Sequence, residues 1–183
     1  MTSQNPIAPP NPAPPLPDGV EILPEASGHA DAIEALNALS FGPGRFAKSA
    51  YKLRRNNPAV QAYNLVCMLD ARLIGAVCFS HIRIGAAPAL LLGPLAVHPD
   101  FKNKGIGLAL MRDGMAAARS AGEPLVVLVG DAPYYARAGF LPVPRGQMTM
   151  PGPVDYGRLL ACEFVPGSLA QARGVMRPDP RPT

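Results

Sequence analysis

The stretch LLLGPLAVHPDFKNKGIG, residues 90–107, decides how this chain folds. Its first half is an apolar run typical of a buried strand, and its second half carries Lys102 and Lys104 toward a glycine pair, Gly105 and Gly107. Glycines at a turn from strand to helix let the backbone approach a ligand closely, and the free N–H groups at the start of the helix bind an anion. The two lysines add the positive charge that a pyrophosphate attracts. The stretch therefore predicts a site for a phosphate-bearing ligand.

Two common glycine-loop sites do not fit this spacing. A Rossmann turn requires a third glycine at position 110, where the chain has Leu110, and a P-loop requires Gly-Lys followed by Ser or Thr, which the stretch lacks. Taken alone, the glycine spacing is equally compatible with an ordinary helix start.

Hydrophobic patterns on both sides of this stretch predict a mixed sheet with helices packed on it. Strands are predicted at residues 21–23, 63–69, 73–79, 89–97, 125–129, 147–150 and 159–164, and helices at 27–39, 45–55, 106–120 and 132–138. The runs 63–69 and 73–79 are joined by a short polar link and form an antiparallel hairpin, whereas residues 89–129 form a β-α-β crossover. The predicted fold class is therefore α/β (α+β) with a mixed central sheet.

Prolines mark the ends of the folded domain. The chain has 23 prolines in 183 residues, and they are densest in residues 1–18 and 178–182. Because proline fixes φ and has no N–H, we expect residues 1–18 to be a disordered proline-rich tail, or alternatively a PxxP ligand at Pro12 to Pro15. Residues 173–183 are expected to be a flexible C-terminal tail, which leaves 19–172 as the domain. Within it, Pro94 lies inside the central strand and predicts a bulge.

Charge, cysteines and hydropathy exclude several classes of protein. A net charge of +4 without a dense basic stripe argues against nucleic-acid binding. The chain shows neither a signal-peptide pattern nor an apolar run of about 18 residues, the length of a membrane span. The widely spaced Cys67, Cys78 and Cys162 are interpreted as free thiols, not as a disulfide framework. We therefore expect a cytoplasmic protein that binds no nucleic acid, membrane or metal.

One cluster of basic residues contains no acid. It consists of Arg45, Lys48, Lys52, Arg54 and Arg55. In a continuous helix, positions 45, 48, 52 and 55 share one face. Such a face is usually solvated, and the alternative is that it meets an anionic substrate, a cofactor phosphate or a protein.

A second motif, which follows the glycine loop in the chain, makes the pattern more specific. The stretch VGDAPYYARAGF, residues 129–140, places the end of a strand, a short helix with two tyrosines and a Gly-Phe pair after the loop. Together the two motifs resemble the GNAT superfamily of acyl-CoA-dependent N-acyltransferases, and within it the YhbS-like predicted acetyltransferases of bacteria. The resemblance covers about residues 20–143. The CoA loop of that family, Gln/Arg-x-x-Gly-x-Gly/Ala, falls on residues 102–107, and Lys102 keeps the charge of the usual arginine but not its planar fork.

The resemblance implies a GNAT fold, with helices on both faces of the sheet and a splayed strand pair at the CoA site. It implies that pantetheine pairs with the backbone of Leu95, Ala96 and Val97, and that the pyrophosphate binds the loop amides. The loop residues concerned are Lys102, Asn103, Lys104, Gly105, Ile106 and Gly107. Tyr135 falls on the general acid of the family, which protonates the leaving thiolate. Tyr134 is its rival, and the other interpretation is that both rings only pack the short helix onto the sheet.

The implied function is that of an N-acetyltransferase, which moves an acetyl group from acetyl-CoA to a primary amine by direct attack in a ternary complex. The implied acceptor is a small-molecule amine or an amine of a peptide or protein. A homodimer is a further expectation that is left open. One alternative is a non-catalytic acyl-CoA-binding sensor or regulatory module. Another is a protein-lysine acetyltransferase that docks its partner on the Arg45–Arg55 basic face. The general base is left open among His98, His81, Ser80 and Glu21.

Overall fold

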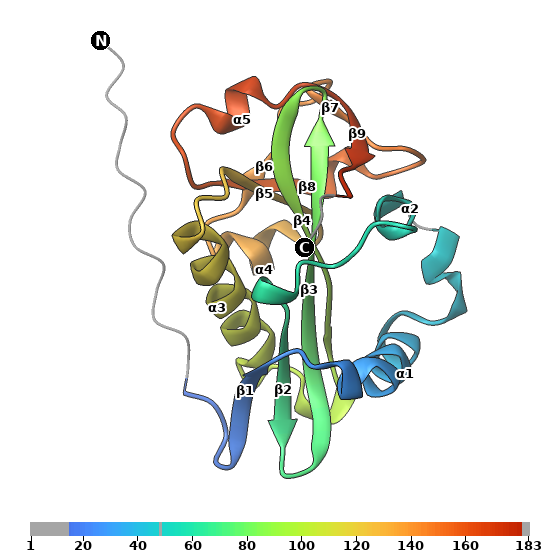
Figure 1. The fold of residues 1–183 in the computed structure, drawn as a ribbon, viewed down its shortest axis with the longest axis vertical. Coiled ribbons are helices and arrows are strands. Elements are labelled where there is room, and N and C mark those ends of the chain that lie inside the picture. The colour runs from blue at the N-terminus through green and yellow to red at the C-terminus, as the bar shows by residue number, and fades with distance from the viewer. Residues whose placement is uncertain (1–14, 48, 181–183) are drawn as a thin grey trace.

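The computed structural model describes residues 15–47 and 49–180. Most of the predicted proline-rich tail and Lys48 of the basic cluster therefore lie outside the described residues. The chain forms one mixed sheet with helices on both faces (Figure 1). The strands are β1 (Val20–Pro24), β2 (Leu65–Leu69), β3 (Arg72–Ile84), β4 (Ala87–Val97), β5 (Leu125–Val129), β6 (Leu141–Pro142), β7 (Met148–Thr149), β8 (Leu159–Glu163) and β9 (Gly174–Pro178).

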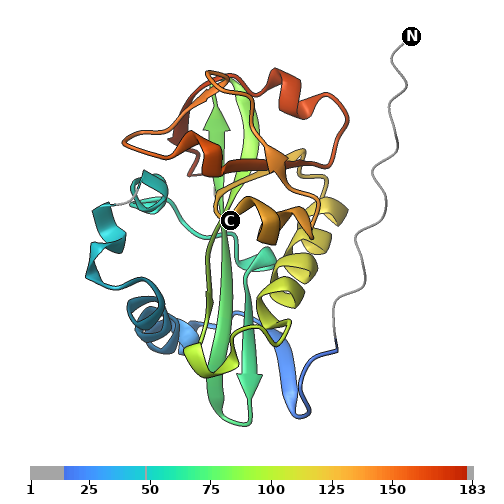
Figure 2. The same ribbon diagram turned by 180° about the vertical axis from the view of Figure 1, so that it is seen from behind.

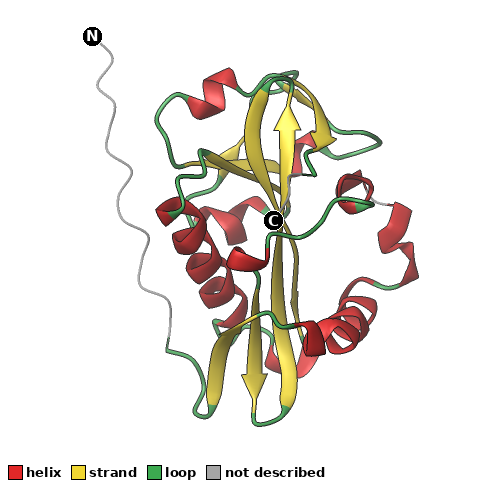
Figure 3. Cartoon of the chain, in the orientation of Figure 1, coloured by secondary structure: helices red, strands yellow, loops and turns green. Residues whose placement is uncertain are grey.

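The sheet has the order β1-β2-β3-β4-β5-β8-β6, with β9 beside β3 and β7 beside β9. Strands β4 and β5 are parallel, as are β7 and β9, and the other pairs are antiparallel. The long strands β3 and β4 run through both halves of the molecule, whereas β1 and β2 lie in one half and β5 to β9 in the other (Figures 1 and 3). The predicted hairpin and β-α-β crossover are both present.

The helices are α1 (Ala30–Phe41), α2 (Ser49–Arg54), α3 (Ile106–Ser120), α4 (Ala132–Ala136) and α5 (Ser168–Gln171). Helices α3 and α4 lie on one face of the sheet, and α1 and α2 lie on the opposite face (Figures 1 and 2). The arrangement of helices on both faces is thus confirmed. The bounds of α3 and β5 are those that the sequence predicts, because each has an uninterrupted pattern and a glycine or proline at its end.

The main core lies between α3 and the sheet. Leu110 and Met111 of α3 are fully buried against Phe79 of β3 and Leu90 of β4. Gly114 allows this close approach, because a Cβ at that position would stand 2.5 Å from Phe79 Cε2 and 2.9 Å from the carbonyl oxygen of Tyr63. One helical position in this core therefore requires the absence of a side chain.

We predict that Gly114→Ala destabilises the fold. Alanine favours a helix over glycine, but overpacking a core typically costs about 1–3 kcal/mol, and one of the two obstacles is backbone. The expected result is a net loss of about 1–2 kcal/mol in the free energy of unfolding, measured by urea denaturation. Gly28→Ala is the control, since nothing lies within 4 Å of the Cβ it adds. An unchanged midpoint for Gly114→Ala would show that the helix moves freely away from β3.

Strands β4 and β5 separate after a short pairing. They pair at Leu90 with Val126 and at Leu91 with Val127, whereas β3 stays paired with β4 as far as Val97. The register between β3 and β4 shifts where Gly93 and Pro94 stand opposite Cys78. This bulge confirms the interpretation of Pro94, and the strands are splayed as expected.

The C-terminal region differs from the sequence prediction. Residues 174–178 form β9, which pairs with both β3 and β7, and Met176 is fully buried opposite Ile84. The flexible tail expected from residue 173 is therefore wrong in its first half. Two adjacent apolar residues, Val175 and Met176, among arginines, glycine and proline give no recognisable strand pattern.

The basic segment is not one helix. Residues 43–47 form a 3₁₀ turn, since Pro43 and Gly44 at its start disfavour a regular α-helix, and α2 begins at Ser49. Arg45 is only 6% exposed, forms an ion pair with Glu34 and donates a hydrogen bond to the Gly42 carbonyl. The continuous helical face predicted for positions 45, 48, 52 and 55 is therefore wrong, since its first member is turned inward and paired.

The three cysteines are free thiols, as expected. Burial is the largest cause that raises the pKa of each thiol, to about 11 for Cys67 and Cys78. Within the described residues, no helix is long and apolar enough to cross a membrane.

Candidate active site

The loop between β4 and α3 borders a cleft of about 330 Å³. Every predicted cofactor-binding residue except Lys104 lines it. These residues are Leu95, Ala96, Val97, Lys102, Asn103, Gly105, Ile106 and Gly107, and they are joined by Ser40, Phe41, Phe101, Leu108, Tyr134, Tyr135 and Arg137. The ammonium of Lys104 instead lies 5.0 Å from the centre of the Phe101 ring, outside the lining. The structure thus brings together segments that the two sequence motifs contribute separately.

The loop geometry fits an anionic ligand. Asn103 and Gly105 have φ angles of 63° and 80°, which turn the chain so that Gly105 is the N-cap of α3. The hydrogen bond from Ala109 N–H to the Gly105 carbonyl begins the helix, so the amides before Ala109 have no acceptor inside it. Those amides face the cleft side of the helix start, where they suit the pyrophosphate of a CoA molecule.

Gly107 makes the cleft possible. A Cβ on this residue would stand 2.5 Å from Tyr134 Oη and 3.4 Å from Val97 Cγ2. The absence of a side chain therefore lets the Tyr134 hydroxyl lie directly against the start of α3.

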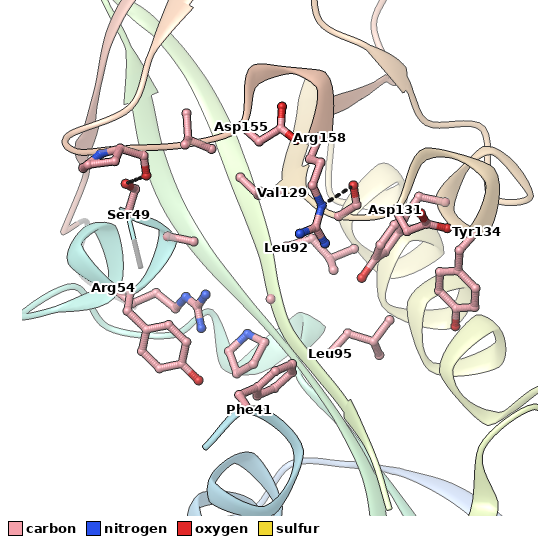
Figure 4. Close-up of a pocket in the computed structure, with 18 residues that line it drawn as sticks. Phe41, Ser49, Arg54, Leu92, Leu95, Val129, Asp131, Tyr134, Asp155 and Arg158 are labelled. Atoms are coloured by element: carbon pink, nitrogen blue, oxygen red, sulfur yellow. Dashed lines mark hydrogen bonds between the residues drawn. The ribbon is translucent and has the colours of Figure 1, made fainter. Parts of the chain in front are cut away.

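A second, larger cavity of about 530 Å³ lies where β4 and β5 splay apart, and residues of both strands line it (Figure 4). Phe41, Leu95, Tyr134 and Tyr135 line both this cavity and the cleft. The remaining walls come from α2, from residues 92–94 of β4, from residues 129–131 and from residues 153–158. The two spaces therefore meet at Leu95 and the two tyrosines.

Tyr135 lies at this meeting point. Its ring makes edge contacts with Tyr134 (centres 5.0 Å apart) and Phe140 (6.0 Å apart). A side chain at Gly130 would overlap the Tyr135 ring, so the glycine leaves room for it. Burial first, and then the neighbouring Tyr134, raise the pKa of Tyr135 to about 12. The phenol therefore keeps its proton at neutral pH.

Tyr134 differs in its surroundings. Its hydroxyl lies against Gly107 at the start of α3, and in Figure 4 its ring points toward that helix. Burial raises its pKa as well, while Arg137 lowers it. Both tyrosines thus reach the junction, and both also pack α4 against its neighbours.

The larger cavity contains charged residues that the sequence did not mark as site residues. Arg54 and Arg158 point into it from opposite sides, and Asp131 and Asp155 complete the charged lining (Figure 4). Asp131 lies two residues after the end of β5, near a strand end where polar side chains often belong to a site. The sequence pattern places Arg54 only in the basic cluster.

The four candidates for a general base line neither space. His98 Nε2 lies 2.7 Å from Arg72 Nη2, and His81 Nε2 lies 2.7 Å from Glu123 Oε1. Ser80 is fully buried, and Glu21 is on the edge strand β1. In residues 15–47 and 49–180, no group of three or more His, Cys, Asp or Glu side chains is placed to hold a metal ion.

The profile of the Acetyltransferase (GNAT) family matches residues 31–140, a range that contains both the glycine loop and the tyrosine helix. The chain belongs to the GNAT acetyltransferase family. The GNAT resemblance expected from the two motifs is confirmed, and so are the fold and the enzyme class, which is that of acyltransferases. Acetyl-CoA is the acyl donor of this family.

Two relatives from Escherichia coli K12 are called uncharacterized N-acetyltransferases. The chain is 29% identical to YjhQ over 128 residues, which is 68% of this chain and 70% of YjhQ. It is 32% identical to YhbS over 124 residues, which is 66% of this chain and 71% of YhbS. The YhbS-like character expected from the sequence is thereby supported.

Solved GNAT structures have the same fold. The crystal structure of E. coli YhbS in complex with CoA superposes with a TM-score of 0.75, covers 92% of this chain and 93% of its own, and is 24% identical. A GNAT acetyltransferase from Brucella melitensis in complex with acetyl-CoA gives a TM-score of 0.60 at 28% identity, with coverage of 80% and 89%.

Proposed function

We propose that this GNAT protein transfers an acetyl group from acetyl-CoA to the primary amine of a small molecule, by direct attack in a ternary complex. The observation that carries the proposal is the junction at Leu95 and Tyr135, where the cleft and the larger cavity meet. A donor in the cleft and an amine in the cavity would meet there, beside the other two residues that line both spaces, Phe41 and Tyr134. Such a cavity, at about 530 Å³, has the size of a small-molecule site.

The cleft residues have distinct roles in the proposal. The backbone of Leu95, Ala96 and Val97 pairs with the pantetheine arm, because β4 has left β5 at this point. The amides of residues 102–107 bind the pyrophosphate, with Lys102 adding charge. Bound acetyl-CoA supplies a thioester, which is the activated acetyl group of the reaction.

Tyr135 is the proposed general acid. Its hydroxyl donates a proton to the sulfur as the carbon–sulfur bond breaks, while the amine nitrogen bonds to the acetyl carbon and loses a proton to water, from which Tyr135 regains its own. Burial raises the pKa of Tyr135 to about 12, which keeps the proton on the phenol until the thiolate forms beside it. None of the three cysteines lines either space, so no acyl-cysteine enters the proposal.

We predict that deprotonation of the Tyr135 phenol does not lower kcat/KM between pH 7 and 10. An acid catalyst is active while protonated, so its contribution is lost as pH rises through its pKa, here about 12. We expect kcat/KM for acetyl-CoA, at saturating amine, not to fall between pH 7 and 10. Circular dichroism at each pH checks that the fold persists. A profile that falls to half near pH 9 in a folded protein would contradict the protonated-phenol proposal.

The direct test of the function is release of free thiol from acetyl-CoA with a panel of amines, amino acids, polyamines and peptides. The expected result is amine-dependent thiol release, with the acetylated amine identified by mass spectrometry. Binding of acetyl-CoA without amine-dependent release would instead favour the sensor or regulatory module. Docking of a protein on the Arg45–Arg55 basic face has lost its structural basis, because Arg45 is buried against Glu34.

A further inference from the structure

The guanidinium of Arg54 is the most unusual charge in the larger cavity. Arg54 is the last residue of α2, and its Nη2 lies 3.8 Å from the point where a Cβ of Gly93 would stand. Its guanidinium carbon lies 4.3 Å from the centre of the Tyr51 ring. In Figure 4 the guanidinium points from α2 into the cavity. Arg54 therefore lies beside the bulge where β4 leaves β5.

The charge of Arg54 is not balanced by an acid. Within residues 15–47 and 49–180, no ion pair joins it to a carboxylate, and its Nε and Nη1 atoms are shielded from solvent without a hydrogen-bond partner. Burial lowers the pKa of this guanidinium, an effect that Cys78 and Tyr51 partly oppose. A shielded cation that lacks a counter-charge is unfavourable, and an anionic ligand would remove that cost.

The other charged side chains in the cavity each have a polar contact or an oppositely charged neighbour. Arg158 donates to the Gly130 carbonyl (Nε to O, 3.4 Å), and it shares the Tyr135 end of the cavity with Asp131. The carboxylate of Asp155 accepts a hydrogen bond from Gly157 N–H at 2.9 Å. The cavity is thus mixed in charge beside Tyr135 and purely cationic beside Arg54.

Resting on the proposed function, we propose that the acceptor is a small amine that also bears a carboxylate, of the amino-acid class. Its carboxylate binds Arg54, and its amine lies at the Tyr135 end, where Asp131 favours a cationic group. Arginine is the side chain best suited to a carboxylate, because its donors match the two oxygens. Arg54 offers one positive charge at its end of the cavity, which a carboxylate matches better than a phosphate dianion does.

The test compares each amino acid with its C-terminal amide in the thiol-release assay, with phosphoethanolamine as a separate arm. For the wild type we expect kcat/KM to be about 10- to 100-fold higher for the acids than for the amides, as for a hydrogen bond to a charged group. Arg54→Gln should remove the preference, and Arg54→Lys, which keeps the charge, should retain part of it. Arg55→Gln is the matched control, because Arg55 is an exposed neighbour outside the cavity lining.

Three outcomes would overturn this inference while the proposed acetyltransferase activity stands. The first is an equal kcat/KM of the wild type for amino acids and for their amides. The second is that Arg54→Gln lowers kcat/KM by the same factor for both. The third is a higher kcat/KM of the wild type for phosphoethanolamine than for amino acids. If no amine releases thiol, the proposed function itself fails, and the Arg54 site is tested by calorimetry in the presence of CoA. N-acetylated amino acids should then bind the wild type about tenfold or more tightly than their amides, and Arg54→Gln should abolish the difference. Equal binding to the wild type would overturn the inference.

Discussion

Tyr135→Phe is expected to lower kcat by about 100- to 10,000-fold, the usual contribution of a positioned general acid. The phenylalanine ring keeps the edge contacts with Tyr134 and Phe140, so the packing of α4 should be preserved. The loss should therefore appear in kcat, while the Kd for acetyl-CoA stays within about twofold of the wild type. Steady-state thiol release gives kcat, and isothermal titration calorimetry gives the Kd.

Tyr134→Phe is the matched control for this variant. It removes the hydroxyl that lies against Gly107, and we expect an effect on cofactor affinity with less than a tenfold change in kcat. If Tyr134→Phe shows the large loss of kcat and Tyr135→Phe does not, the proton donor is Tyr134. If neither variant lowers kcat, both rings only pack α4 and the thiolate leaves without a tyrosine donor.

The lining of the cleft could be predicted from the sequence because most of its residues lie close together in the chain. The β4 strand, the lysine and glycine loop and the start of α3 are consecutive, so the identity and order of residues 95–107 predict their geometry. Lys104 is the exception, because only the folded loop shows that its side chain lies near Phe101. The bulge at Pro94 was predictable because proline removes a ladder donor.

The residues that line the larger cavity could not be predicted from the sequence in the same way. Its walls come from α1, α2, β4, the end of β5 and residues 153–158, which are far apart in sequence and carry no shared motif. Arg54 belonged to a run of basic residues, and sequence periodicity placed that run on a single helical face. Residues 43–47 instead form a 3₁₀ turn and residues 49–54 a short helix, with Arg45 turned toward Glu34 and Arg54 toward the cavity. The charged lining of the larger cavity is therefore the part that required the structure.

Gly107→Val is expected to raise the Kd of acetyl-CoA about 100-fold. The valine Cβ would stand 2.5 Å from Tyr134 Oη, and its two methyl groups would extend farther into the cleft that the pyrophosphate needs. Tyr134 itself lines the cleft, so a shift of its hydroxyl also disturbs that space. An overpacking cost of about 3 kcal/mol corresponds to roughly a 100-fold change in affinity. Calorimetry with acetyl-CoA measures this change directly.

Gly28→Val is the control for Gly107→Val, because it also adds a branched side chain near a helix start but meets no atom within 4 Å of its Cβ. It should bind acetyl-CoA as the wild type does. Thermal unfolding of both variants separates a blocked cleft from a damaged fold, since a specific block leaves the Tm nearly unchanged. Wild-type affinity in a folded Gly107→Val variant would mean that the cofactor does not pass over the start of α3. The roles proposed for residues 102–107 would then be wrong, while those of Leu95 and Tyr135 would still stand on the junction of the two spaces.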